Sequence, residues 1–103
     1  RFPEALVFLR RASVFAPADP DVLLAQAACD ARLGHSDFAE KSLRRGLEAH
    51  PRDSRFYKEL TALFLMQERP DAAEQVLKMA DREIPNQAQA MRRELERRLK
   101  SQR

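Results

Sequence analysis

The sequence predicts an all-α fold, an α-solenoid of antiparallel helix pairs with about six helices. Three observations support this prediction. Certain residue types recur every 34 positions, apolar residues within each segment follow helical intervals of three and four, and the 103-residue chain has only two glycines. The recurring positions are Pro17, Pro51 and Pro85; Ala5, Ala39 and Ala73; Leu9, Leu43 and Leu77; and Ala12, Gly46 and Ala80.

The first two helices are bounded by proline, aspartate and glycine. We expect a helix over residues 3–16, with Pro3 in its first turn, where its missing N–H would have no partner. Asp19 is expected to cap a second helix, over residues 20–33. Gly34 should end that helix, because glycine accepts the left-handed conformation that a helix C-terminus often needs.

The third and fourth helices have similar signals. Asp37 with Glu40 is expected to open the third helix, which runs to about His50 before Pro51 stops it. Asp53 is expected to cap the fourth helix, over about residues 54–67.

The last two helices follow further prolines. A fifth helix is expected over about residues 70–83, and a sixth over about residues 87–101. Asn86 and Gln89 have the spacing of a capping box, which predicts that the sixth helix begins just after Asn86.

A 34-residue helix-turn-helix unit closed by proline resembles the tetratricopeptide repeat, TPR. The characteristic family positions are occupied in both complete units, although the first unit has polar Gln26 and Asp30 where the family prefers apolar residues. In the unit 20–53 these positions hold Leu23, Gln26 with Ala27, Asp30, Ala39, Leu43 and Pro51. In the unit 54–87 they hold Tyr57, Leu60 with Thr61, Phe64, Ala73, Leu77 and Pro85.

The resemblance implies one helical-repeat domain over residues 1–103. It divides into a half repeat at 1–19, full repeats at 20–53 and 54–87, and a capping or half-repeat helix at 88–103. We expect this domain to be part of a longer protein, in which stacked neighbours bury the apolar faces that a single hairpin leaves open.

The family resemblance also implies a function, a noncatalytic scaffold that binds a peptide or protein on its concave surface. The first helix of each unit would form that surface, with an apolar floor and mainly basic edges that suit an acidic or amphipathic segment. An alternative is that Leu65 and Met66 are partly buried and the arginines are an ordinary solvated face. The expected partner-binding residues are Leu24, Ala28, Arg32, Arg55, Lys58, Ala62, Leu65, Met66, Arg92 and Arg93.

Two other functions compete with this one. Residues 92–103 hold six basic residues against two acidic ones, so the basic C-terminal helix could bind RNA or an anionic surface. Nucleic acid is disfavoured, because this stretch has no aromatic residue to stack on bases. The excess of arginine over lysine hints at a bacterial source, where such scaffolds often serve periplasmic, envelope, secretion or polysaccharide-export assemblies.

Catalysis, cofactors and metals are not expected. His35 and His50 stand apart without a ligand pattern, Cys29 lies among alanines, and there is no glycine-rich phosphate loop. No apolar run approaches the roughly 20 residues that span a bilayer, so no transmembrane segment is expected. The sequence assigns no compartment.

Self-association, or further repeats upstream, is expected at the N-terminal half repeat. The expected helix 3–16 lacks the helix that would normally pair with it, so Phe2, Leu6 and Leu9 should lie on an incompletely covered face.

Overall fold

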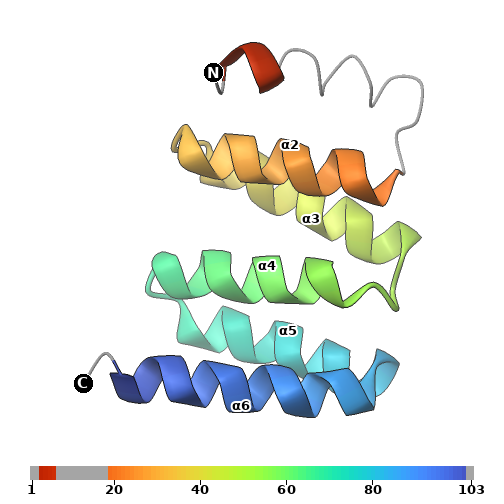
Figure 1. Ribbon diagram of the computed structural model, residues 1–103, viewed down its shortest axis with the longest axis vertical. Coiled ribbons are helices and arrows are strands. Elements are labelled where there is room, and N and C mark those ends of the chain that lie inside the picture. The colour runs from red at the N-terminus through yellow and green to blue at the C-terminus, as the bar shows by residue number, and fades with distance from the viewer. Residues whose placement is uncertain (1–2, 7–18, 102–103) are drawn as a thin grey trace.

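A computed structural model of the chain describes residues 3–6 and 19–101. Residues 3–6 are helical, and no β-strand occurs in either described range, which confirms the all-α prediction. The remainder of the helix expected at 3–16 lies outside the described residues. Residues 19–101 form the helices α2 (Pro20–Arg32), α3 (Ser36–Ala49), α4 (Ser54–Met66), α5 (Pro70–Glu83) and α6 (Pro85–Ser101) (Figure 1).

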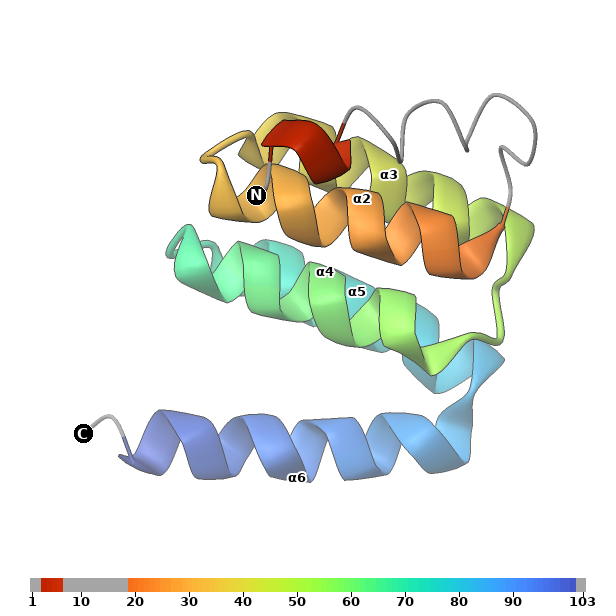
Figure 2. The same ribbon diagram turned by 45° about the horizontal axis from the view of Figure 1, so that its top comes forward.

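The helices form two layers. In Figure 1, α2, α4 and α6 lie nearer the viewer than α3 and α5, and Figure 2 shows α3 behind α2 and α5 behind α4. Each helix packs against the next one in sequence, and α2 also contacts α4 directly. The layer of α2, α4 and α6 therefore contains the first helix of each expected unit.

The two central helix pairs have the same boundaries displaced by 34 residues. Helices α2 and α4 each have 13 residues and begin at positions 20 and 54. Helices α3 and α5 each have 14 residues and begin at positions 36 and 70. The period seen in the sequence is thus a period of secondary structure.

The turns inside the two pairs are also alike. Gly34 has φ +82°, as predicted, and Glu68, one period later, has φ +57°. In each turn the following amide donates to a carbonyl five residues earlier, at 2.7 and 2.8 Å. These bonds close the ends of α2 and α4 and occupy carbonyl groups that would otherwise have no helical partner.

Both predicted aspartate caps are confirmed. Asp19 accepts a hydrogen bond from the backbone N–H of Val22 at 3.1 Å. Asp53 accepts one from the backbone N–H of Arg55 at 3.1 Å. Each carboxylate therefore occupies one of the free amides at the start of its helix.

The start of α3 differs slightly from the prediction. The helix begins at Ser36, and Asp37 lies inside its first turn. His35 occupies the capping position without a side-chain hydrogen bond to the helix. Asp37 can still interact favourably with the positive end of the helix there.

The predicted capping box at the start of α6 is wrong. The helix begins at Pro85, so both Asn86 and Gln89 are already helical. The carbonyl of Ile84 accepts the N–H of Ala88 at 2.8 Å, and Ile84 alone separates α6 from α5. Proline fits the first helical position because it has no N–H to leave unpaired.

One continuous apolar core runs through α2 to α6. Its largest fully buried side chains include Tyr57, Phe56 and Phe64. Gly46 is essential to the contact between α3 and α4, because a Cβ at this position would overlap the ring of Phe56. The small residue that recurs in this column therefore permits a close crossing of two helices.

Leu6 does not lie on an uncovered face as expected. It is buried, with 5% of its surface exposed. The other two residues of that expectation, Phe2 and Leu9, lie outside the described residues.

Candidate functional site

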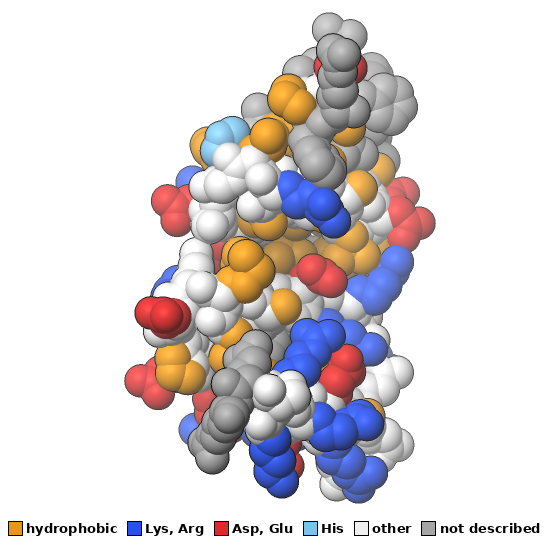
Figure 3. All heavy atoms as spheres, turned by 60° about the vertical axis from the view of Figure 1, so that its left-hand side comes forward, with side chains coloured by type: hydrophobic (Ala, Val, Ile, Leu, Met, Phe, Trp, Pro, Cys, Tyr) orange, Lys and Arg blue, Asp and Glu red, His pale blue; other side chains and the backbone are white. Residues whose placement is uncertain are grey.

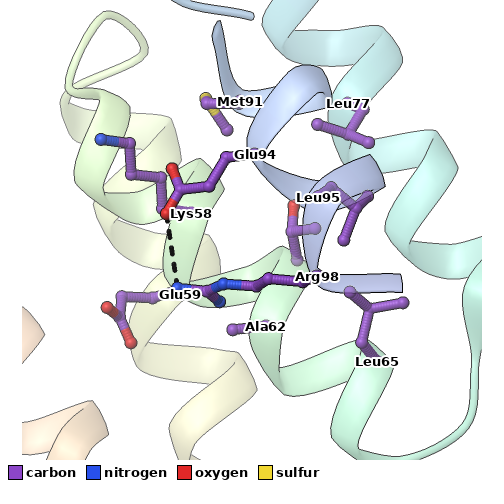
Figure 4. Close-up of a pocket in the computed structure, with 10 residues that line it drawn as sticks. Lys58, Glu59, Ala62, Leu65, Leu77, Met91, Glu94, Leu95 and Arg98 are labelled. Carbon is purple, nitrogen blue, oxygen red and sulfur yellow. Dashed lines mark hydrogen bonds and ion pairs between the residues drawn. The ribbon is translucent and has the colours of Figure 1, made fainter. Parts of the chain in front are cut away.

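The most promising site is a groove between α4 and α6, with α5 at its base (Figure 4). We name it the α4–α6 groove, and its volume is about 170 Å³. Its lining residues are Lys58, Glu59, Thr61, Ala62 and Leu65 of α4, Leu77 of α5, and Met91, Glu94, Leu95 and Arg98 of α6.

The interior of the groove is apolar. Leu77 and Met91 are buried at its base, whereas Ala62, Leu65 and Leu95 are half-buried along its walls. These side chains lie on helical intervals of three or four within α4 and α6, so each helix turns one apolar strip toward the groove. A partner that excludes water from this partly covered apolar surface would lower the free energy of the complex.

The rim of the groove carries balanced charge. Lys58 and Arg98 are exposed cations, and Glu59 and Glu94 are exposed anions. Figure 4 shows Arg98 and Glu94 joined at the mouth, where their ion pair measures 3.4 Å. This rim differs from the mainly basic edge expected from the sequence.

Thr61 provides a polar group within this apolar setting. The residue is 7% exposed, and its Oγ1 has no hydrogen-bond partner among the described residues. A buried hydroxyl without a partner costs free energy, so such groups are uncommon. The hydroxyl could donate to, or accept from, a ligand that enters the groove.

Only part of the predicted binding set is brought together here. Lys58, Ala62 and Leu65 all line the groove. Met66 follows Leu65 but projects into solvent, with 76% of its surface exposed.

The predicted residues on α2 lie beyond the groove. Ala28 and Arg32 are exposed, whereas Leu24 is half-buried and packs against the core.

Arg55 forms ion pairs with two carboxylates. Its guanidinium lies 2.8 Å from Asp21 and 2.7 Å from Asp53. The hydrogen bond from Arg55 is the main reason that the pKa of Asp53 falls below its usual 3.8, and the same carboxylates raise the pKa of Arg55. Arg55 is therefore a link between the starts of α2 and α4 more than a free cation.

Arg92 points toward α5 and away from the groove. Its guanidinium lies 2.9 Å from Glu74 and 2.6 Å from Asp81, both on α5. Asp81 is the main cause of the raised pKa of Arg92, and Arg92 in turn lowers the pKa of Asp81. Arg93, the next residue, is exposed on another side of α6.

Several groove residues were not in the predicted set. Thr61, Glu94, Leu95 and Arg98 all line the cavity. The period gave a usable signal, because Leu95 lies one period after Thr61. Thr61 and Leu95 therefore hold equivalent positions in successive units, and both line the same groove.

Other reactive side chains are scattered. Cys29 is a free, buried cysteine. Within residues 3–6 and 19–101, no group of three or more His, Cys, Asp or Glu side chains is placed to hold a metal ion.

None of the described helices combines enough length with enough apolar character to cross a bilayer.

No protein-family model matches this chain, and no curated protein matches it significantly.

Proposed function

We propose that this chain is a noncatalytic TPR-like scaffold that binds a protein or peptide segment through the α4–α6 groove. The observation that carries the proposal is an apolar groove between α4 and α6, with a buried hydroxyl in its wall that has no partner among the described residues. The arrangement of α2 to α5 as two helix pairs with boundaries 34 residues apart supports the repeat interpretation.

The size of the groove favours a side chain over a free small molecule. Pockets for small molecules and cofactors usually measure roughly 300–1,000 Å³. The α4–α6 groove measures about 170 Å³, which suits one bulky apolar side chain. Such a side chain would act as the anchor of a longer segment that runs over the rim.

The polar groups favour an amphipathic partner over a strongly acidic one. Two cations and two anions surround the mouth, so a highly charged segment of either sign would meet like charges. An apolar anchor with mixed polar neighbours would bury the walls and could satisfy the hydroxyl of Thr61. Leu24, Ala28 and Arg32 of α2 lie beyond the groove and Met66 projects into solvent, so the rest of such a segment could contact them.

Peptide selection against the intact chain tests the proposal. Random peptides would be selected for binding and measured by isothermal titration calorimetry. The variant Ala62→Phe fills the groove from a half-buried position, and Ala49→Phe adds the same ring at an exposed position of α3. We expect Ala62→Phe to weaken binding at least about tenfold, equivalent to about 1.4 kcal/mol, and Ala49→Phe to have no effect.

Two outcomes would contradict the proposed site. Peptides that bind Ala62→Phe as tightly as the original chain would place binding elsewhere. Selected peptides without any apolar anchor would show that the groove is not the recognised feature. Thermal melting of both variants would show that they remain folded.

A further inference from the structure

The outer surface of α6 has a stripe of three cations that the α4–α6 groove does not use. Arg93, Arg97 and Lys100 are all exposed and are spaced by four and three residues, which places them along one side of the helix. Together with Glu96 they line a shallow, open depression. Figure 3 shows Lys and Arg side chains gathered at the α6 end of the molecule.

These three cations form no ion pair within the described ranges, whereas most of the other described arginines do. Arg44, Arg55, Arg69, Arg92 and Arg98 each form an ion pair with a carboxylate. No ion pair joins Arg93, Arg97 or Lys100 to another described residue. Their charges are therefore available to a partner.

The stripe also differs from the equivalent positions of α4. One period earlier, Arg97 and Lys100 correspond to Leu63 and Met66 of α4. Leu63 is buried in the core and Met66 is exposed, whereas Arg97 and Lys100 are both exposed. At the position of Leu63, α6 therefore has a solvated cation in place of a buried apolar residue.

We propose that this stripe is a docking surface for an acidic helical segment of a partner protein. The three cations are about 6 and 4.5 Å apart along the helix axis, so the stripe is about 10 Å long. A helix lying along α6 presents carboxylates at the same intervals when they are spaced by four and three residues. Arginine suits this role because its guanidinium can pair with a carboxylate through two hydrogen bonds.

The short length of the stripe argues against a long polyanion. A nucleic acid duplex or an anionic membrane extends well beyond about 10 Å. Polybasic membrane sites usually combine about four to eight cations. This face also lacks an aromatic side chain on which single-stranded bases could stack.

Two designed helical peptides provide the probe. The first carries three glutamates spaced by four and three residues, and the second has the same composition with the glutamates distributed around the helix. Binding to the intact chain would be measured by fluorescence anisotropy at low and at high salt. We expect the striped peptide to bind more tightly and to lose affinity as salt screens the charges.

Matched variants locate the contact. The first combines Arg93→Ala, Arg97→Ala and Lys100→Ala; the control combines Arg52→Ala, Lys78→Ala and Arg82→Ala, which removes three other exposed cations. We expect the first to weaken binding of the striped peptide about tenfold and the control to weaken it less than about twofold. Reversing the three stripe residues to glutamate should transfer the preference to a lysine-striped peptide.

Several results would overturn this docking surface. These are equal affinity for the two peptides, equal loss in the two triple variants, or tighter binding of an RNA duplex or of phosphatidylserine vesicles than of the striped peptide, with that binding lost in the stripe variant. Ala62→Phe fills only the groove and should leave striped-peptide binding unchanged. The groove and the stripe can therefore fail independently.

Discussion

The guanidinium of Arg55 donates from Nη1 to Oδ1 of Asp21 at 2.8 Å, and the two residues are 34 positions apart in the sequence. The ion pair joins the first turn of α4 to the first turn of α2, at equivalent points of successive units. Both side chains are exposed, so its value lies more in alignment than in stability. Arg55 also forms an ion pair with Asp53, the residue that caps α4. The same guanidinium therefore contacts both the start of α2 and the cap of α4.

Acid should weaken this connection through Asp53. The pKa of Asp53 in the folded chain is below the usual 3.8 because Arg55 stabilises its charged form. Its contribution to stability is therefore complete above about pH 3.8 and is lost as pH falls through the lower folded pKa. We expect Arg55→Gln to raise the pKa of Asp53 toward 3.8 in a carboxyl titration followed by NMR. An unchanged pKa would show that Arg55 does not stabilise the charged form.

Stability measurements give a second test of the same linkage. Asp53→Asn keeps a capping side chain but cannot change its charge. We expect its melting temperature to fall less than that of the original chain when the pH is lowered from about 5 to about 2.5. Equal decreases would show that other carboxylates account for the acid sensitivity.

Gly46→Ala should destabilise the chain, against the usual preference of helices. Alanine normally stabilises a helix interior by roughly 0.5–1 kcal/mol relative to glycine. Here its Cβ would overlap the fully buried ring of Phe56, and such overpacking typically costs about 1–3 kcal/mol. We expect a net loss of about 1–2 kcal/mol in the free energy of unfolding, measured by urea denaturation.

The background Phe56→Leu provides the control for this steric argument. A smaller side chain leaves room for the added Cβ, so the penalty for Gly46→Ala should shrink or reverse. A penalty of the same size in both backgrounds would mean that the overlap with Phe56 is not its cause.

Glu68→Gly should stabilise the chain. Glu68 is exposed and has φ +57°, a left-handed conformation that costs a non-glycine residue about 1 kcal/mol or more. Gly34 occupies the equivalent turn one period earlier. Allowing for the greater freedom of glycine in the unfolded chain, we expect a gain of about 0.5–1 kcal/mol by urea denaturation.

Glu68→Ala is the matched control because it removes the same charge but keeps a Cβ. We expect little or no gain from it. If alanine stabilised as much as glycine, loss of the charge would be the cause, and the backbone argument would be wrong.

The sequence predicted the elements that local chemistry determines. Gly34 ends α2, Asp19 and Asp53 cap their helices, and the repeated small residues permit close helix crossings. Glu68 was missed because nothing about glutamate itself signals a left-handed turn. Only its position, 34 residues after Gly34, carried that information.

The candidate site was harder to predict than the helices. The side chain of Arg92 turns toward carboxylates on α5, whereas Glu94 and Arg98 reach the groove. The rotation of α6 about its axis determines which residues do so. The apolar strip of α6 indicates which side faces the core, but it does not show which of the flanking charged side chains turn toward α5.

The hydroxyl of Thr61 gives the last prediction, because it separates a structural role from a binding role. Oγ1 is buried and has no partner among the described residues, so Thr61→Val should leave stability unchanged or raise it by up to about 1 kcal/mol. Thr61→Ser keeps the hydroxyl but removes a buried methyl group, and should lower stability by about 0.8 kcal/mol. For peptides selected on the groove the order should reverse, with Thr61→Val weakening affinity more than Thr61→Ser. Urea denaturation and calorimetry measure the two effects separately. A large loss of stability in Thr61→Val would mean that the hydroxyl already has a partner in the free chain. It would then not be available to bind a ligand.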